Sequence, residues 1–288
     1  MLIVEKEVVL CGKYPRIARL AFEYDWIEDP RVFVEQVRRS GKAVDVFSFL
    51  GKVDEGSNVY EFPQAVESIS VIPLSTYDVW WKRQINDKTR NMIRKSHKAG
   101  VEVRLMEFTD ELVHGIKQIY DESPLRQGKP FAHYGKDFDT LKKDHASFLE
   151  KSEFVGAFYD NKLIGFIKLV HGVGLSHLMQ IISQKSYQSK APSNALIAKA
   201  VEICAKRQVA YLHYGIWSMR GLGDFKRHHG FECLNLRRYY IPLNWRGRLF
   251  LTLNLHHDFA DRMPEWLVDF MVNLRTRLYM RKYGMGKA

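Results

Sequence analysis

The 288-residue chain lacks the features that would place it in several large classes of protein. It has no apolar run near the roughly 18–20 residues that a membrane-spanning helix needs. Residues 1–5 show no basic region followed by a longer apolar core, so no signal peptide is indicated. Its three cysteines, Cys11, Cys204 and Cys233, are far apart, which favours reduced thiols over a disulfide framework or a zinc site. We therefore expect a cytoplasmic protein.

Widespread catalytic and ligand-binding motifs are missing as well. The sequence contains no P-loop, no Gly-x-Ser-x-Gly and no Gly-x-Gly-x-x-Gly. Its histidines show no metal-ligand spacing with cysteines or carboxylates, so we expect no metal site and no tightly bound cofactor. Function must be inferred from less general patterns.

What the chain does have is an ordinary globular composition with an uneven positive charge. Hydrophobic residues make up 46% and the net charge is +11. Residues 77–104 carry eight Lys or Arg against three Asp or Glu, and residues 262–288 carry six against two. Two basic zones favour anionic partners such as phosphates, RNA or an anionic membrane surface, with solvated basic faces as an equal alternative.

The first third of the chain predicts short mixed elements. Pro30–Arg39 has helical spacing, and Tyr77–Ala99 reads as one long polar helix that ends at Gly100. Strands are expected at Leu2–Leu10, Val44–Leu50, Ser68–Pro73 and Gly100–Leu105.

The remainder predicts the order helix, helix, hairpin, strand, helix, strand, helix, strand. The expected elements are Asp110–Tyr120, a helix to Leu149, Phe154–Tyr159 and Leu163–Val170 around Asp160-Asn161-Lys162, Gly174–Ser183, Ala195–Arg207, Val209–Tyr214, Gly221–His229 and Arg238–Leu243. An α/β fold with a mixed sheet and helices on its faces follows from this order.

Gly221–Phe231 is the most specific stretch, a short helix opened by glycine after a predicted strand. Phe225 is expected to anchor this helix inward, while Lys226 points toward an adjacent face. An ammonium fixed there can neutralise a phosphate or a developing oxyanion. A solvated helix lysine is the ordinary alternative.

Gln184–Ala195 is the candidate phosphate-binding segment, because it leads from a strand into a helix. Ser193 or Asn194 can cap the helix, and Lys190 supplies positive charge. An ordinary capped helix entry is the competing interpretation.

The loop Arg126–Lys136 gathers Arg126, Gln127, His133 and Tyr134, and we expect it to bind substrate. His133 is a candidate general base near neutral pH, against a structural role.

Arg90 and Arg94, four residues apart, lie on one helix face and can clamp a phosphate or carboxylate; a solvated face is an equal alternative. Residues 263–278 form an apolar stripe with arginines late in the helix, which predicts docking against the protein or contact with an anionic membrane.

Three stretches together resemble the FemABX-like branch of the GNAT acyltransferase superfamily: Thr89–Val101, Phe154–Gly165 and Gly221–Phe231. The resemblance implies tandem GNAT-like units, the first degenerate, with substrate in a cleft between or beside them. It also implies that Lys226 faces the reaction centre and that Arg90 and Arg94 lie near the substrate cleft. Members of the branch use aminoacyl-tRNA, and relatives use acyl-CoA.

On this resemblance we expect a degenerate unit at 1–105, an acyltransferase domain at 106–245 and a basic helical tail at 246–288. The expected function is N-acyl transfer, with acyl-CoA as the donor, to an amine of a small molecule or cell-envelope precursor. Lys226, His133, Tyr134 and Tyr240 are the catalytic candidates. Arg90, Arg94, Arg126 and Gln127 are expected to bind substrate, and Lys190, Ser193 and Asn194 the donor.

Two alternatives remain open. One is an aminoacyl-tRNA-dependent transferase of peptidoglycan precursors, favoured by the basic zones. The other is a non-catalytic module on the same fold that binds nucleic acid or a membrane surface through the tail. The sequence chooses neither the donor nor the acceptor.

Overall fold

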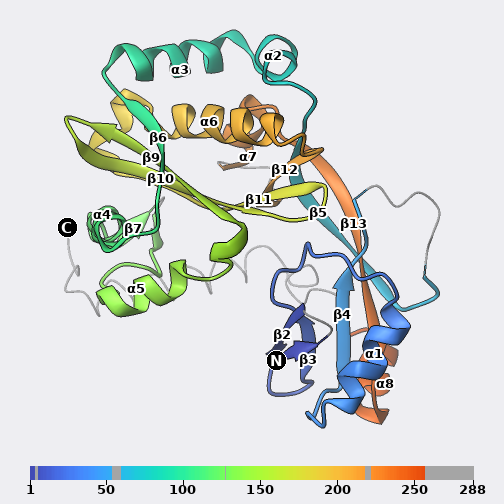
Figure 1. The fold of residues 1–288 in the computed structure, drawn as a ribbon. Helices are drawn as coiled ribbons and strands as arrows, with labels where there is room; N and C mark the ends of the chain where they lie inside the picture. Colours follow the sequence, from blue (N-terminus) through green and yellow to red (C-terminus); the bar gives the residue numbers. More distant parts are fainter. Residues whose placement is uncertain (4–5, 54–59, 127, 218–221, 257–288) are drawn as a thin grey trace. The chain divides into compact units, whose positions relative to one another are not determined.

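The computed structural model describes residues 1–3, 6–53, 60–126, 128–217 and 222–256 (Figure 1). The chain divides into two compact units that are discontinuous in sequence. Unit 1 takes Met1–Ile69, Gly172–Leu175 and Cys233–Met263, and unit 2 takes Ser70–His171, Ser176–Glu232 and Pro264–Ala288. Residue 105, the expected end of the first domain, lies inside unit 2.

Unit 1 is built on strands in the order β1-β2-β3-β4-β13. Their bounds are Leu2–Ile3 for β1, Lys6–Cys11 for β2, Ile17–Leu20 for β3, Val46–Leu50 for β4 and Glu232–Pro242 for β13. β3 runs parallel to β4, and β4 runs antiparallel to β13. Helix α8 (Trp245–Thr252) follows β13 along the chain.

Helix α1 (Pro30–Arg39) has the bounds that the sequence predicts, because its signals are local. The side chain of Asp29 accepts hydrogen bonds from the backbone of Arg31 and Val32, and Pro30 occupies the first turn. Phe33, Val34 and Val37 are buried against the strands of unit 1.

Unit 2 contains the second run of strands, in the order β5-β12-β11-β10-β9-β6. The bounds are Gln64–Pro73 for β5, which begins in unit 1, Glu102–Met106 for β6, Ser152–Tyr159 for β9, Lys162–His171 for β10, Leu175–Ser183 for β11 and Tyr211–Ile216 for β12. The pairs β6–β9, β9–β10 and β10–β11 are antiparallel. Asp160 and Asn161 both have positive φ at the β9–β10 turn, as the predicted hairpin requires.

Helices cover both faces of the unit 2 sheet (Figure 1). On one face lie α3 (Asp87–Lys98) and α6 (Pro192–Lys206), and on the other lie α4 (Asp110–Tyr120) and α5 (Phe138–His145). The short hairpin β7–β8 (Leu125–Arg126 and Lys129–Pro130) precedes α5, and α7 (Leu222–His228) follows β12. This confirms the predicted mixed α/β fold and the predicted order of elements.

The single helix predicted over Tyr77–Ala99 is wrong, because the segment is broken in two. Helix α2 (Tyr77–Val79) passes into a π-helical turn at Trp80–Gln84, and Ile85 is extended. Asn86 then caps α3 by accepting a hydrogen bond of 2.9 Å from the backbone of Thr89. The interruption lets the buried indole of Trp80 donate a 2.9 Å bond to the carbonyl of His229.

Candidate functional site

A cavity of about 650 Å³ lies within unit 2, where β11 ends and α6 begins. Its walls come from the β7–β8 hairpin, the end of β11, the start of α6, β12 and α7. The residues that line it are Arg126, Gly128, Ile181, Ile182, Ser183, Lys185, Gln188, Ala191, Pro192, Ser193, Asn194, Tyr214, Leu222 and Phe225. Three predicted ligand-binding residues therefore share one cavity: Arg126, Ser193 and Asn194.

The N-terminus of α6 borders this cavity without a side-chain cap. Ala191 precedes the helix in the left-handed region (φ 54°), and Pro192 takes the first turn. The prediction that Ser193 or Asn194 caps the helix is wrong, because both side chains are engaged elsewhere. Ser193 Oγ lies 2.8 Å from Ser183 Oγ. The first turn of α6 thus keeps its positive dipole end uncompensated by a cap.

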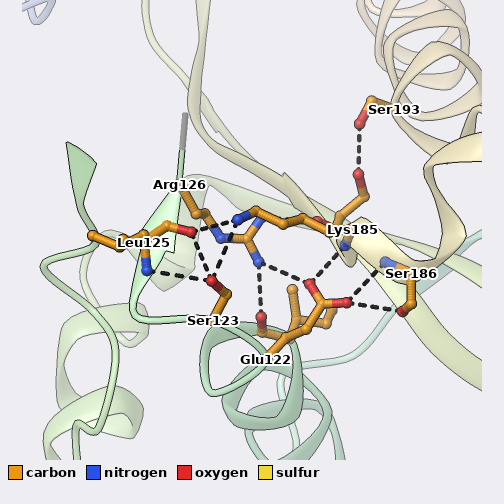
Figure 2. A network of polar contacts seen from close by, with 9 residues as sticks. Glu122, Ser123, Leu125, Arg126, Lys185, Ser186 and Ser193 are labelled. Atoms are coloured by element: carbon orange, nitrogen blue, oxygen red, sulfur yellow. Dashed lines mark hydrogen bonds and ion pairs between the residues drawn. The ribbon is translucent and has the colours of Figure 1, made fainter. Parts of the chain in front are cut away.

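Arg126 is fixed beside that helix end by carbonyl groups (Figure 2). Its Nη1 donates to the carbonyl of Ser183 at 2.8 Å, and its Nη2 donates to the carbonyl of Ile119 at 2.9 Å. The guanidinium stacks on Phe131 at 4.9 Å, and Nε is buried with no hydrogen-bond partner. Its Nη2 also lies 3.7 Å from Glu122 Oε2, so Arg126 brings to the cavity a positive charge that Glu122 partly offsets.

The carboxylate of Glu122 binds the first residues of the predicted phosphate-binding segment Gln184–Ala195. Its carboxylate accepts bonds from the backbone of Lys185 (2.6 Å) and Ser186 (2.9 Å) and from Ser186 Oγ (2.8 Å) (Figure 2). Burial raises the pKa of Glu122, but these bonds outweigh it, so the pKa is lowered and the group is ionised. The backbone N–H groups of Lys185 and Ser186 are therefore already bound by a carboxylate of the protein. Only the end of the segment at the start of α6 is left to bind a ligand.

Two lysines of that segment lie differently. Lys185 lines the cavity and donates through Nζ to the carbonyl of Leu125 at 2.6 Å. Lys190 lies over the ring of Tyr159 at 3.8 Å and is not among the described lining residues. Gln127, the remaining predicted residue of this region, lies outside the described residues.

Asn194 is oriented by a buried histidine. His229 Nδ1 lies 2.8 Å from the carbonyl of Phe225, which can only accept, so Nδ1 carries the proton. Nε2 is then an acceptor, and Asn194 Nδ2 donates to it at 3.1 Å. Burial lowers the pKa of His229 to about 4, which keeps the ring neutral near pH 7. This contact ties the start of α6 to α7.

Lys226 is buried rather than turned to solvent, with only 3% of its surface exposed. Its Nζ donates to the carbonyl of Ile216 at 2.7 Å and to Ser70 Oγ at 3.1 Å, and it lies 4.7 Å from the centre of the Tyr214 ring. Burial lowers its pKa to about 8. Phe225 and Lys226 are neighbours on α7, but only Phe225 lines the cavity, and Lys226 lies behind the ring of Tyr214.

Arg90 and Arg94 make contacts within their own segment. Arg90 Nη1 donates to the carbonyls of Trp81 and Ile85, both at 2.7 Å, so this guanidinium closes the broken turn before α3. Arg94 stacks over Trp81 at 5.5 Å and donates to Asn91. Neither is among the described residues that line the cavity.

The proton-handling candidates are dispersed. His133 stacks on Tyr120 at 4.9 Å, and its Nδ1 is buried without a hydrogen-bond partner. Burial, and then the charge of Lys136, lowers the pKa of His133. Tyr134 packs against the same apolar cluster. Tyr240 belongs to unit 1, where its hydroxyl donates to the carbonyl of His256 at 3.3 Å.

The sequence interpretation missed the residues that shape the cavity through distant contacts. Glu122, His229, Ile181 and Tyr214 carry no local motif for such a role. Within the described ranges no group of three His, Cys, Asp or Glu side chains is arranged to hold a metal ion.

The described part defines a mixed α/β protein with a cavity at the start of a helix. At the level of sequence, no family model matches the chain and no curated protein is similar to it. Among solved structures it is similar to FemX, with 8% identity over 86% of each chain and a TM-score of 0.62. It is also similar to the C-terminal domain of a lysylphosphatidylglycerol synthetase from Agrobacterium fabrum, with 11% identity over 88% of this chain and 86% of that one and a TM-score of 0.57.

A third similar structure is L-PGS from Bacillus licheniformis, with 12% identity over 81% of this chain and 80% of that chain and a TM-score of 0.55. These likenesses confirm the resemblance to the FemABX-like branch at the level of the fold. Among the helices that the structure describes, none combines the length and apolar character needed to cross a membrane. The predicted tail helix at residues 263–278 lies outside the described residues.

Proposed function

We propose that the chain is an N-acyltransferase that binds an activated acyl donor in the cavity of unit 2. The observation that carries this proposal is the uncapped N-terminus of α6, bordering a cavity of about 650 Å³ that Arg126 also lines. Helix N–H groups and arginine are the usual partners of phosphate. The diphosphate of coenzyme A has the matching charge. The name of a structural neighbour, lysylphosphatidylglycerol synthetase, describes attachment of an aminoacyl group to a lipid, which supports acyl transfer in general but does not favour an amine as the acceptor.

In the proposed reaction, the nitrogen of an acceptor amine attacks the acyl carbonyl carbon. The new C–N bond forms, and the C–S bond of a thioester breaks with its electron pair leaving on the thiolate. The amine loses one proton. Positioning of the two reactants and stabilisation of the oxyanion supply most of the rate in such sites. The acceptor is an amine of a small molecule or cell-envelope precursor.

His133 is the first proposed base for that proton, because burial favours its neutral form, and it belongs to unit 2 without being among the described residues that line the cavity. Tyr134, in the same unit, is a further candidate. Replacing His133 with Asn removes the base and keeps a polar group. If His133 takes the proton, the variant loses turnover while its donor affinity stays unchanged.

Lys226 is proposed as a positioning residue. Its ammonium supports the ring of Tyr214 from behind and adds positive potential to the wall that Tyr214 forms. Such a charge stabilises an oxyanion without touching it. Arginine at 226 keeps the charge, so Lys226→Arg retains more turnover than Lys226→Met.

Aminoacyl-tRNA is the alternative donor, and the exposed face of the helical segment α2–α3 favours it. Arg83, Lys88, Lys95 and Lys98 are exposed there and have no ion pair with any described residue. A polyanion gains affinity from each such contact, and the affinity falls with salt. Lys190, Arg90 and Arg94 would add to donor or substrate binding in either case.

A donor-binding screen tests the proposal. Wild-type protein is titrated with coenzyme A, acetyl-CoA, a longer acyl-CoA and charged tRNA, and the melting temperature is followed. A donor that binds only the folded state at 100 times its Kd adds about 2.7 kcal/mol of stability. We expect one donor class to produce such a shift and to support transfer to an amine.

Arg126→Gln is the informative variant, and Arg237→Gln, an exposed arginine of unit 1, is its matched control. Loss of a charge-assisted contact at Arg126 should raise the donor Kd roughly tenfold or more. The control should leave it unchanged. Equal Kd values in both variants, or binding without any transfer to amines, would contradict the proposal and favour a non-catalytic module.

A further inference from the structure

The cavity has an apolar side that the phosphate-binding groups do not use. Ile181 of β11, Tyr214 of β12, and Leu222 and Phe225 of α7 line it there. Ile181, Tyr214 and Phe225 also pack against the buried core beneath α6. This side of the cavity therefore belongs to the packed interior of unit 2 and holds its shape.

Hydrogen bonds connect the start of α6 to the phosphate-binding side of the cavity and to its apolar side. Toward the β7–β8 hairpin, Arg126 bonds to Ser183, whose hydroxyl meets Ser193. Toward α7, Asn194 bonds to His229, whose ring lies 4.2 Å from that of Phe225. A donor with its phosphates at the helix end and Arg126 can extend through the cavity and bring its acyl end to the apolar side.

Every ionisable group among the described lining residues that carries charge near pH 7 is cationic, namely Arg126 and Lys185. The nearby carboxylate of Glu122 is already bound by the backbone of Lys185 and Ser186, and it forms an ion pair of 3.7 Å with Arg126. Residues 127 and 218–221, which lie outside the described ranges, include no Asp or Glu. Lys226 adds a further positive charge behind Tyr214.

An ammonium group placed on this side would lose water, find no carboxylate and meet like charges. Burial of an unpaired charge is strongly unfavourable, whereas an aliphatic or aromatic group gains from leaving water. We propose that the transferred acyl group ends in an uncharged, apolar side chain and that the cavity rejects cationic ones. This inference rests on the proposed donor site and names its substrate class. The lysyl group in the name of the structural neighbour would be a poor substrate here.

A matched pair of donors tests the inference. Isovaleryl-CoA and β-alanyl-CoA share the coenzyme and differ mainly in the apolar or cationic end of the acyl group. We expect the isovaleryl donor to bind roughly 10- to 100-fold more tightly. Where charged tRNA proves to be the donor, the same contrast is made between leucyl-tRNA and lysyl-tRNA, because both carry the same α-amine.

The outcomes separate the two proposals. Equal or tighter binding of the cationic donor overturns the specificity and leaves the donor site standing. Absence of binding by coenzyme A, every acyl-CoA and every charged tRNA overturns the donor site and the specificity together.

Leu222→Glu provides a gain-of-function test. Leu222 is half-buried at the first turn of α7, where a carboxylate is compatible with the helix dipole. We expect this variant to bind β-alanyl-CoA at least about tenfold more tightly than wild type and isovaleryl-CoA more weakly. Leu222→Gln, similar in size but uncharged, should weaken the isovaleryl donor and gain nothing for the cationic one. A folded Leu222→Glu protein without that gain overturns the inference.

Discussion

One buried basic side chain of unit 1, Arg238, and one of unit 2, Lys226, are held in opposite ways. Arg238 in unit 1 is paired with the carboxylates of Glu23 and Glu67. Lys226 in unit 2 is held by a hydroxyl, a carbonyl and an aromatic ring, with no carboxylate among its hydrogen-bond partners. Burial opposes the charge at Arg238, but Glu67 and Glu23 outweigh it and raise its pKa. At Lys226 burial prevails and lowers the pKa to about 8.

The two side chains thus contrast a neutralised buried charge with an uncompensated one. The charge of Arg238 is neutralised by its own unit, so it can contribute little to a ligand. The charge of Lys226 is uncompensated beside a cavity wall, where an incoming anion would stabilise it. The same arrangement costs unit 2 stability while the site is empty, as is common where function opposes stability.

Arg238→Met should have the largest effect on stability. It leaves Glu23 and Glu67 without their shared partner, and breaking a buried ion pair costs about 3–5 kcal/mol. Guanidinium chloride unfolding measures the loss. Arg237→Met, at the adjacent exposed position, is the control and should change little. If the free energy of unfolding falls by less than about 1 kcal/mol, the ion pairs of Arg238 with Glu23 and Glu67 contribute little to the stability of unit 1.

Acidification should weaken unit 2 through its buried neutral histidines. The folded pKa of His229 is about 4 against an ordinary 6.5, so the unfolded chain binds the proton first. Stability is therefore intact above pH 6.5 and falls as the pH drops to 4, by about 3 kcal/mol for this group. The unfolding free energy is measured at pH 7, 6, 5 and 4.

His229→Asn keeps a donor toward the carbonyl of Phe225 but cannot titrate. Its unfolding free energy should depend less steeply on pH than that of the wild type. Parallel pH profiles for the two proteins would show that His229 is not the group responsible.

Lys226→Met should raise stability, in contrast to Arg238→Met. Burying the ammonium costs about 3 kcal/mol at pH 7, and the two lost hydrogen bonds return part of this, so we expect a net gain of about 1 kcal/mol. The wild type should recover stability as the pH rises from 8 to 10.5, because the folded lysine loses its proton first. Because the neutral lysine keeps its hydrogen bonds, the two unfolding curves should cross, and the wild type should be more stable than Lys226→Met by about 2 kcal/mol at high pH. Destabilisation by Lys226→Met across this whole range would count against an uncompensated charge.

Local signals explain what could be predicted from the sequence. Pro30–Arg39 and Asp110–Tyr120 have the predicted bounds because Asp29 and Thr109 cap them from the adjacent position. The β9–β10 hairpin was predictable from the turn residues Asp160 and Asn161, which both have positive φ. The order of elements in the second half, and hence the fold class, came from such signals added together.

The candidate site depends on contacts across long sequence separations, which local patterns do not contain. Ser193 does not cap α6, because its hydroxyl meets Ser183. Glu122 reaches the backbone of Lys185, 63 residues later. The buried ammonium of Lys226 donates a hydrogen bond to Ser70, 156 residues earlier. The sequence predicted ligand binding at Arg126 and at the start of α6, which both border the cavity, but not which half of the segment Glu122 occupies.

Hydrogen exchange with and without donor tests the central claim most directly. The donor is the acyl-CoA or charged tRNA that gives the largest thermal shift, and exchange is followed by peptide across both units. We predict slower exchange at residues 181–196 and 222–228 of unit 2, which surround the cavity, and unchanged exchange at β4 and α1 of unit 1. Protection confined to unit 1, or saturating binding without protection at the start of α6, would contradict the donor site proposed for this protein.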